Sequence, residues 1–137
     1  RVGVRDDRER PPLRDVARQL QAYFNGDLRE FDVPLRMEGT PFQRGVWRAL
    51  QDIPYGETIS YGELARRIGN PKGSRAVGLA NGRNPIPIVV PCHRIVRTGG
   101  KMGGYGGTLG PYIAGPEIKQ RLLELEGALD ERGRPRV

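Results

Sequence analysis

The sequence predicts a single, mainly helical domain with a small β wing, arranged as a winged helix-turn-helix. Apolar residues recur at helical spacing in several segments. Helix-capping sequences directly precede two of these segments. Two short helical segments are separated by a four-residue link, which is typical of a helix-turn-helix. The length of 137 residues suits one domain, and 20 glycines and 12 prolines predict many turns and short elements.

The N-terminal part is expected to contain a lead-in, one helix and an extended linker. Residues 1–12 mix charges and end in prolines, so we expect them to be flexible. Apolar spacing predicts a helix that starts at Leu13 and includes Val16, Ala17, Leu20 and Phe24. Asn25-Gly26 should end it. Residues 31–35 are expected to be a short extended piece, because Pro34 disfavours a central strand.

Two capping boxes predict the next helices. Thr40-Pro41-Phe42-Gln43 should open a helix through Val46, Trp47 and Leu50 that closes near residues 54–56. Ser60-Tyr61-Gly62-Glu63 should open a second helix, which carries Leu64, Ala65 and Ile68 and stops at Gly69.

The next helix is predicted from Ser74 to Asn81, with Gly82 ending it. Ala76, Gly78 and Ala80 are expected to keep one surface small, with Arg75 at its N-terminal end. Such a surface would let the helix approach a sugar-phosphate wall closely, or would simply allow tight packing against another helix. The residues alone leave both interpretations open.

The remaining elements are a wing, a loop, a helix and a tail. Residues 94–105 surround Thr98-Gly99-Gly100 and are expected to form a β-hairpin. Residues 103–116 are rich in glycine and proline and should form a loop. Pro116 should begin a helix with Ile118, Leu122 and Leu125 towards the core, and residues 130–137 should be a disordered tail.

Composition narrows the class of protein. The net charge of +7 and the pI of about 10.2 favour a polyanionic partner, although a merely basic protein would show the same values. No run of about 20 apolar residues exists to span a bilayer. The single cysteine precludes an internal disulfide, and a reducing, cytoplasmic location is expected. One cysteine and one histidine cannot form a Cys/His zinc site, so no metal is predicted.

The only cysteine and the only histidine are neighbours, Cys92 and His93. A lone cysteine is usually buried and inert. Here Pro91 fixes the preceding backbone, His93 offers a base, and Arg94 adds positive potential that would favour the thiolate. Neighbouring side chains on an extended segment point to opposite faces, so direct contact requires a turn there. The group that orients the imidazole could be one of the acidic residues of the last helix, Glu117, Glu124 or Glu126.

These residues carry a family resemblance. The motif PCHRI, preceded by NPIPIVV and followed by GGYGG, is similar to the active-site signature of the O6-alkylguanine-DNA alkyltransferases, the methylated-DNA–protein-cysteine methyltransferases. The similarity includes residues 39–85, covers roughly Leu13 to Gly107 in all, and resumes at LLELEG. It implies a DNA-binding and alkyl-acceptor domain over residues 39–129. Residues 1–38 would then be a remnant of the family's N-terminal β domain.

The resemblance implies DNA repair by irreversible transfer of an alkyl group from O6-alkylguanine in duplex DNA, and also from O4-alkylthymine, to the protein's own cysteine. Cys92 would be the acceptor and His93 the water-linked base. Glu126 would orient the imidazole, and Asn84 would fix the turn between recognition helix and active site. Tyr61 would crowd the adjacent phosphate and hydrogen-bond the guanine ring. The protein would act once, as a monomer, without a cofactor.

The resemblance also assigns residues to the DNA and to the base. Arg75 would fill the gap left by a flipped nucleotide, in a minor-groove interface whose other members would be Tyr61, Ser74, Ala76, Gly78 and Arg83. The pocket for the flipped base would be lined by Ile95, Met102, Gly103, Tyr105, Gly106 and Gly107. The backbone carbonyls of Cys92 and Ile95 would accept from the guanine amine.

Three other functions would fit parts of this sequence. A non-catalytic binder of alkylation damage would lack the reactive cysteine, whereas Cys92 is present. A winged-helix transcription regulator would not need the Pro-Cys-His-Arg motif. A cysteine hydrolase would lack the surrounding family sequence and would turn over.

Overall fold

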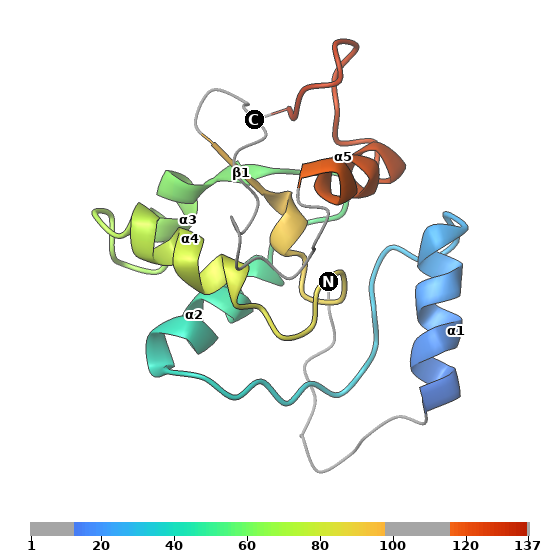
Figure 1. Cartoon of the computed structure of the whole chain (residues 1–137), viewed down its shortest axis with the longest axis horizontal. Helices are drawn as coiled ribbons and strands as arrows, with labels where there is room; N and C mark the ends of the chain where they lie inside the picture. Colours follow the sequence, from blue (N-terminus) through green and yellow to red (C-terminus); the bar gives the residue numbers. More distant parts are fainter. Residues whose placement is uncertain (1–12, 98–115, 137) are drawn as a thin grey trace.

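The computed structural model describes residues 13–97 and 116–136, and these are mainly helical, with one small sheet (Figure 1). In chain order the elements are α1 (Leu13–Phe24), α2 (Pro41–Leu50), β1 (Ile59–Ser60), α3 (Tyr61–Arg67), α4 (Ser74–Gly82), the 3₁₀ turn η1 (Cys92–Arg94), β2 (Ile95–Val96) and α5 (Pro116–Leu125). The predicted fold class is confirmed. Within the described ranges no helix is both long enough and apolar enough to cross a membrane.

The capping sequences start the helices at the predicted residues. At α2 the box is complete, because Thr40 Oγ1 accepts from the Gln43 backbone N–H and the Gln43 side chain accepts from the Thr40 N–H. At α3 only half of it forms. Ser60 Oγ accepts from the Glu63 N–H at 3.0 Å, but the Glu63 carboxylate turns to other side chains of its own helix, Arg66 and Arg67.

The described sheet is a pairing that the sequence did not predict. Strand β2 pairs in parallel with β1, in the register Ile59 with Ile95 and Ser60 with Val96. Residues Ile95–Val96 therefore pair with a strand that precedes them by more than 30 positions. The rest of the predicted wing, from residue 98 onwards, lies outside the described residues.

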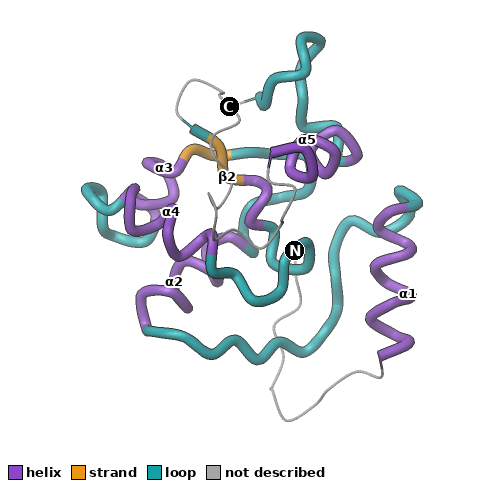
Figure 2. Tube along the Cα trace, in the orientation of Figure 1, coloured by secondary structure: helices purple, strands orange, loops and turns teal. Residues whose placement is uncertain are grey.

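Helix α4 packs against α2 and α3, and α5 packs against η1. A single main core lies between them, with Trp47, Leu50 and Leu64 almost completely buried. The indole N–H of Trp47 donates to the carbonyl of Ala80 at 2.9 Å, which ties α2 to α4. Helix α1 stands to one side of this group, joined to it by the long loop before α2 (Figure 2).

The end of the chain is ordered up to residue 136, which corrects the expected disordered tail. Leu129 and Pro135 form an antiparallel bridge. The carboxylate of Asp130 accepts from the backbone N–H groups of Arg132 and Arg134, both at 2.9 Å. Thr58 then donates to the carbonyl of Arg136 at 3.0 Å. The backbone N–H groups of this turn are hydrogen-bonded within the turn, and the bond from Thr58 joins it to the loop before β1. These bonds explain why the segment after α5 is ordered.

Candidate active site

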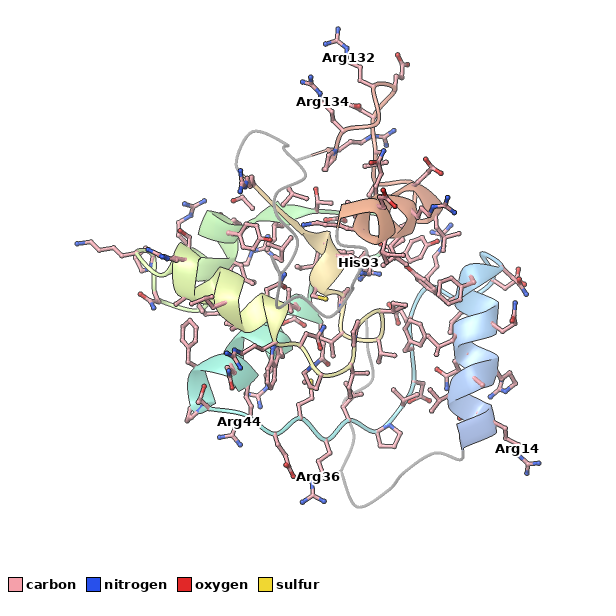
Figure 3. The ribbon with its side chains drawn as sticks, viewed as in Figure 1. Arg14, Arg36, Arg44, His93, Arg132 and Arg134 are labelled. Carbon is pink, nitrogen blue, oxygen red and sulfur yellow. The ribbon has the colours of Figure 1, made fainter. Side chains whose placement is uncertain are left out.

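Cys92 and His93 lie on a tight turn, which is the condition that lets neighbours act together. Residues Cys92–Arg94 form the 3₁₀ turn η1, and the N–H of Arg94 donates to the carbonyl of Pro91 at 3.0 Å. A 3₁₀ turn advances each side chain by about a third of a revolution, so the two side chains are not forced onto opposite faces as in a strand. Cys92 and His93 are both fully buried, and His93 lies inside the fold in Figure 3.

The imidazole of His93 is oriented by Glu126, which lies directly after the last residue of α5. The Nε2 atom of His93 is 2.7 Å from Glu126 Oε2. Burial acts to raise the pKa of Glu126, but hydrogen bonds and charges from His93 and Arg94 hold it well below its usual range. An ionised carboxylate can only accept, so Nε2 carries the proton and Nδ1 presents a lone pair.

The same geometry keeps the imidazole neutral. Burial lowers the pKa of His93, against the opposing effect of Glu126. The Nδ1 atom is buried and has no hydrogen-bond partner among the described residues. A neutral imidazole with an available lone pair is the form that can take a proton from a thiol.

Glu126 is the centre of a buried network. Its two oxygens accept from Arg94 Nε at 2.8 Å and from Arg94 Nη2 at 2.9 Å. They also accept from the hydroxyl of Tyr23 at 2.6 Å and from the backbone N–H of Gly56 at 3.3 Å. Arg94 donates in addition to the carbonyl of Ile53 at 2.6 Å. The expectation that Arg94 favours the thiolate is therefore wrong in its detail, since its charge is paired with Glu126.

A different cation lies near the sulfur. Lys119 of α5 is fully buried, and its Nζ lies 5.8 Å from the centre of the Tyr61 ring. Burial lowers the pKa of Lys119 to about 8, and the charge of Cys92 acts in the opposite direction. Burial, followed by the charge of Cys92, raises the pKa of Tyr61 to about 12, so this phenol keeps its proton. Cys92, Lys119 and Tyr61 are thus one electrostatic group.

The turn between α4 and η1 is held by Asn84, which follows the end of α4. The side-chain N–H of Asn84 donates to the carbonyl of Val90 at 2.7 Å, and Asn84 Oδ1 accepts from the N–H of Ile86 at 2.9 Å. Ile88, inside this turn, has φ of 75°, a left-handed conformation that a β-branched residue adopts only under constraint. Asn84 lies where the sequence analysis placed it, at the joint between the helix and the thiol.

Helix α4 presents a mixed surface where a smooth one was expected. Ala76 is exposed, but Ala80 is buried, and Gly78 faces Tyr61, whose ring would be 3.7 Å from an added Cβ. The period of 3.6 residues places positions 76, 78 and 80 on different sides or at different depths. The exposed side instead carries Leu79, 64% exposed, between Arg75 and Arg83 at four-residue spacing. Ser74 is exposed at the start of the same helix.

The structure brings some predicted residues together and leaves others undescribed. Cys92, His93, Glu126, Asn84 and Tyr61 surround one buried site. Ile95 is fully buried next to it, whereas the other predicted pocket residues lie outside the described residues: Met102, Gly103, Tyr105, Gly106 and Gly107. Glu117 and Glu124, the alternative partners for the imidazole, are exposed on α5.

Three residues were missed by sequence reasoning: Tyr23, Asn81 and Lys119. Lys119 precedes Leu122, Leu123 and Glu126 by three, four and seven positions, so helical spacing already placed it on the buried side of α5. Tyr23 follows Val16 and Leu20 at helical spacing, but the sequence analysis counted the neighbouring Phe24 among the apolar positions of this helix. Phe24 is 49% exposed, whereas Tyr23 is buried. No sequence signal distinguishes Asn81, because its amide acts on a backbone carbonyl.

Comparison with known proteins identifies the family of this chain. Residues 41–128 match the family profile described as 6-O-methylguanine DNA methyltransferase, DNA binding domain, and residues 2–37 match the ribonuclease-like domain of the same proteins. The methylated-DNA–protein-cysteine methyltransferase of Methanosarcina acetivorans is 58% identical over 85% of this chain and 70% of its own length. That of Mycolicibacterium paratuberculosis is 61% identical over 79% of this chain and 61% of its own length.

A solved structure is similar as well. The Mycobacterium tuberculosis OGT in complex with DNA has a TM-score of 0.76 and 56% identity, over 83% of this chain and 66% of that one. This chain thus spans about two thirds of the length of the relatives that it matches. The matched range of this chain, residues 41–128, spans Cys92, His93 and Glu126. The chain belongs to the 6-O-methylguanine DNA methyltransferase family.

Proposed function

We propose that this protein repairs DNA by transferring the alkyl group of an O6-alkylguanine to Sγ of Cys92, irreversibly and once per molecule. The observation that supports this most directly is the arrangement of His93, which follows Cys92, the only cysteine, in the sequence. The Nε2 atom of His93 lies 2.7 Å from Oε2 of the ionised Glu126. That arrangement prepares a base for Cys92, whereas a protein that only binds damage needs no such base.

The reaction follows from the groups present. Nδ1 of His93 takes the thiol proton, through a bridging water, and the thiolate attacks the alkyl carbon in line. A carbon–sulfur bond forms as the carbon–oxygen bond to guanine breaks, and the electron pair leaves with the base. Tyr61, whose high pKa keeps it protonated, donates a hydrogen bond to the departing ring. A thioether is a poor leaving group, so the thiol is not regenerated.

Contact with DNA is assigned to α4 and its surroundings. Ser74, Arg75, Ala76 and Arg83 are exposed along this helix. A guanidinium at position 75 can fill the space of a base that has left the stack, and the net charge of +7 favours binding through the phosphates. Figure 3 shows further arginines pointing outward from the fold, among them Arg36 and Arg44.

The remaining assignments belong to the same proposal. Residues 39–129 form the DNA-binding and alkyl-acceptor domain. The wall of the base pocket is assigned to Ile95, Met102, Gly103, Tyr105, Gly106 and Gly107. Covalent transfer to one cysteine needs a single chain and no cofactor. A thiol that must stay reduced suits the cytoplasm, where the DNA substrate is also found.

The test is an intact mass measurement after mixing the protein with a duplex that carries one O6-methylguanine. We expect one methyl group per molecule, located on the peptide that contains Cys92 and absent in Cys92→Ser. His93→Gln should slow alkylation about 100-fold or more with DNA affinity kept. Tight binding of the damaged duplex with no gain in mass would favour the non-catalytic binder instead.

A further inference from the structure

Arg97 directly follows β2 and lies at the edge of the site around Cys92. Tyr61 directly follows β1 in the same way, and the two strands pair in parallel, so Arg97 and Tyr61 leave the sheet at neighbouring positions. Side chains alternate along a strand, which puts Arg97 on the same face as Ile95. Ile95 belongs to the main core together with Cys92, whereas Val96 belongs to a separate small cluster. Arg97 therefore extends the sheet on the side of the thiol.

The charge of Arg97 acts on two groups of the site. Burial is the largest cause of the shifted pKa values of Tyr61 and Lys119, and the charge of Arg97 works to lower the pKa of both. The charge of Cys92 acts on the same two groups. Lys119 is fully buried, whereas Arg97 is exposed. Arg97 is thus a cation at the solvent-facing rim of the group formed by Cys92, Lys119 and Tyr61.

This guanidinium has no opposite charge beside it in the described parts of the chain. Arg94 is paired with Glu126, but no carboxylate within residues 13–97 and 116–136 forms an ion pair with Arg97. An exposed arginine alone would need no partner. Here the fold places it close enough to the ammonium of Lys119 for the two like charges to repel, which costs free energy. An anion bound at Arg97 would offset that cost.

We propose that Arg97 binds a phosphate that flanks the alkylated nucleotide and so holds this nucleotide in the site. This inference rests on the proposed function. In DNA each nucleotide is joined through a phosphate on either side of its sugar, so a nucleotide that leaves the stack takes both phosphates with it. When the alkyl carbon lies at Sγ of Cys92, the sugar, which is attached to the other ring of the purine, lies towards the opening of the site. The phosphates then lie at the rim, where a guanidinium can bind two oxygens of one of them.

Two other roles for Arg97 lead to different results. If its charge acted on the thiol by favouring the thiolate, its loss would slow the reaction with the free alkylated base as much as the reaction with duplex DNA. If it only attracted DNA in general, the loss of another exposed arginine would have the same effect. A phosphate contact at the lesion affects duplex DNA alone and depends on one particular linkage.

The experiment pairs changes in the protein with changes in the phosphate. The substrates are a duplex with one O6-methylguanine, the same duplex with an uncharged methylphosphonate at the linkage before or after the lesion, and O6-methylguanine as the free base. The second-order rate constant of Cys92 alkylation is measured by mass for wild type, Arg97→Gln and Arg14→Gln. Arg14, an exposed arginine of α1 that points outward from the fold, is the matched control for the loss of one positive charge (Figure 3).

We expect Arg97→Gln to slow alkylation about tenfold on the ordinary duplex and to leave the rate on the free base unchanged. A methylphosphonate at one of the two linkages should slow the wild type by a similar factor. On that duplex the wild type and Arg97→Gln should react at the same rate, because the contact is already lost. Arg14→Gln should react like the wild type with every substrate.

The proposal is overturned if Arg97→Gln keeps its full loss of rate with either linkage neutralised, or if it loses as much on the free base. A wild-type rate of Arg97→Gln on the ordinary duplex contradicts it as well. A wild-type protein that gains no mass from the ordinary duplex contradicts the proposed function itself, which is a separate result.

Discussion

The hydroxyl of Tyr23, on α1, donates to Oε2 of Glu126 at 2.6 Å, the same oxygen that holds His93. The two residues are 103 positions apart. Burial, followed by the nearby Glu126, raises the pKa of Tyr23 far above its ordinary value, so the phenol remains a donor. The segment before the DNA-binding helices is therefore bonded to the active site and is more than a remnant beside it.

Tyr23→Phe tests this link. The substitution keeps the ring contacts with Phe31 and Tyr55 and removes only the hydroxyl. We expect the free energy of unfolding to fall by about 1–3 kcal/mol, since a buried carboxylate loses a donor, and alkylation to slow several-fold as His93 is held less firmly. Urea denaturation and the alkylation rate constant check both. Gln21→Leu, which removes an exposed side-chain hydrogen bond to Asn25 from the same helix, is the control, and equal effects of the two changes would refute the link.

Glu126→Gln should damage both chemistry and stability. An amide in place of the carboxylate no longer fixes the proton on His93 Nε2, and it leaves the buried guanidinium of Arg94 without an opposite charge. We expect alkylation to slow about 100-fold and the free energy of unfolding to drop by about 3–5 kcal/mol. Glu124→Gln makes the same change on the exposed side of α5. A similar small loss in the two variants would show that Glu126 does not orient the imidazole.

The sequence predicted what depends on local chemistry. The Thr40 box set the start of α2, and helical spacing set α1, α3, α4 and α5, because capping and amphipathicity act within one or two turns. Glu126 could be placed only through the resemblance, since three glutamates of the last helix were equally suitable by spacing. The pairing of Ile95 with Ile59 could not be foreseen, because a two-residue parallel strand has no periodic signal.

The site residues also separate into those that the sequence revealed and those that it did not. Cys92 and His93 were visible as the rarest reactive residues, side by side. Arg94 was given the wrong role because sequence cannot show that a guanidinium is already paired with a carboxylate. Lys119 was passed over because a lysine on an apolar face is usually explained by its exposed end, whereas here the whole side chain is buried.

The exposed side of α4 should decide DNA affinity. Arg75→Ala is expected to slow repair of O6-methylguanine in duplex DNA about tenfold, with a smaller effect on the free alkylated base, because only the duplex must be held open. Leu79→Glu should weaken binding to undamaged duplex by a similar factor, since it places a negative charge against phosphates. Binding is measured by fluorescence anisotropy at fixed salt. Arg66→Ala, which removes a guanidinium of α3 that is paired with Glu63, is the control for both variants. Equal losses of the Arg75→Ala variant on duplex DNA and on the free base would refute the role of Arg75.

Lys119 is expected to favour reactivity at the cost of stability. Its pKa falls from 10.5 in the unfolded chain to about 8 in the fold, mainly because the ammonium is buried. Between these two values the unfolded state binds more protons, so stability should rise with pH through this window, and the full penalty, about 2–4 kcal/mol, should apply below it. A cation near Cys92 in turn favours the thiolate that attacks the lesion.

Lys119→Met removes the charge and keeps the length of the side chain. We expect the variant to be more stable than wild type near neutral pH, to lose the rise in stability between about pH 8 and about pH 10, and to be alkylated about tenfold more slowly. Urea denaturation at several pH values and the rate of mass gain at Cys92 measure these effects. Lys72→Met changes an exposed lysine of the link before α4 and should alter neither quantity. A less stable Lys119→Met variant that is alkylated at the wild-type rate would show that the buried ammonium serves the fold and not the sulfur.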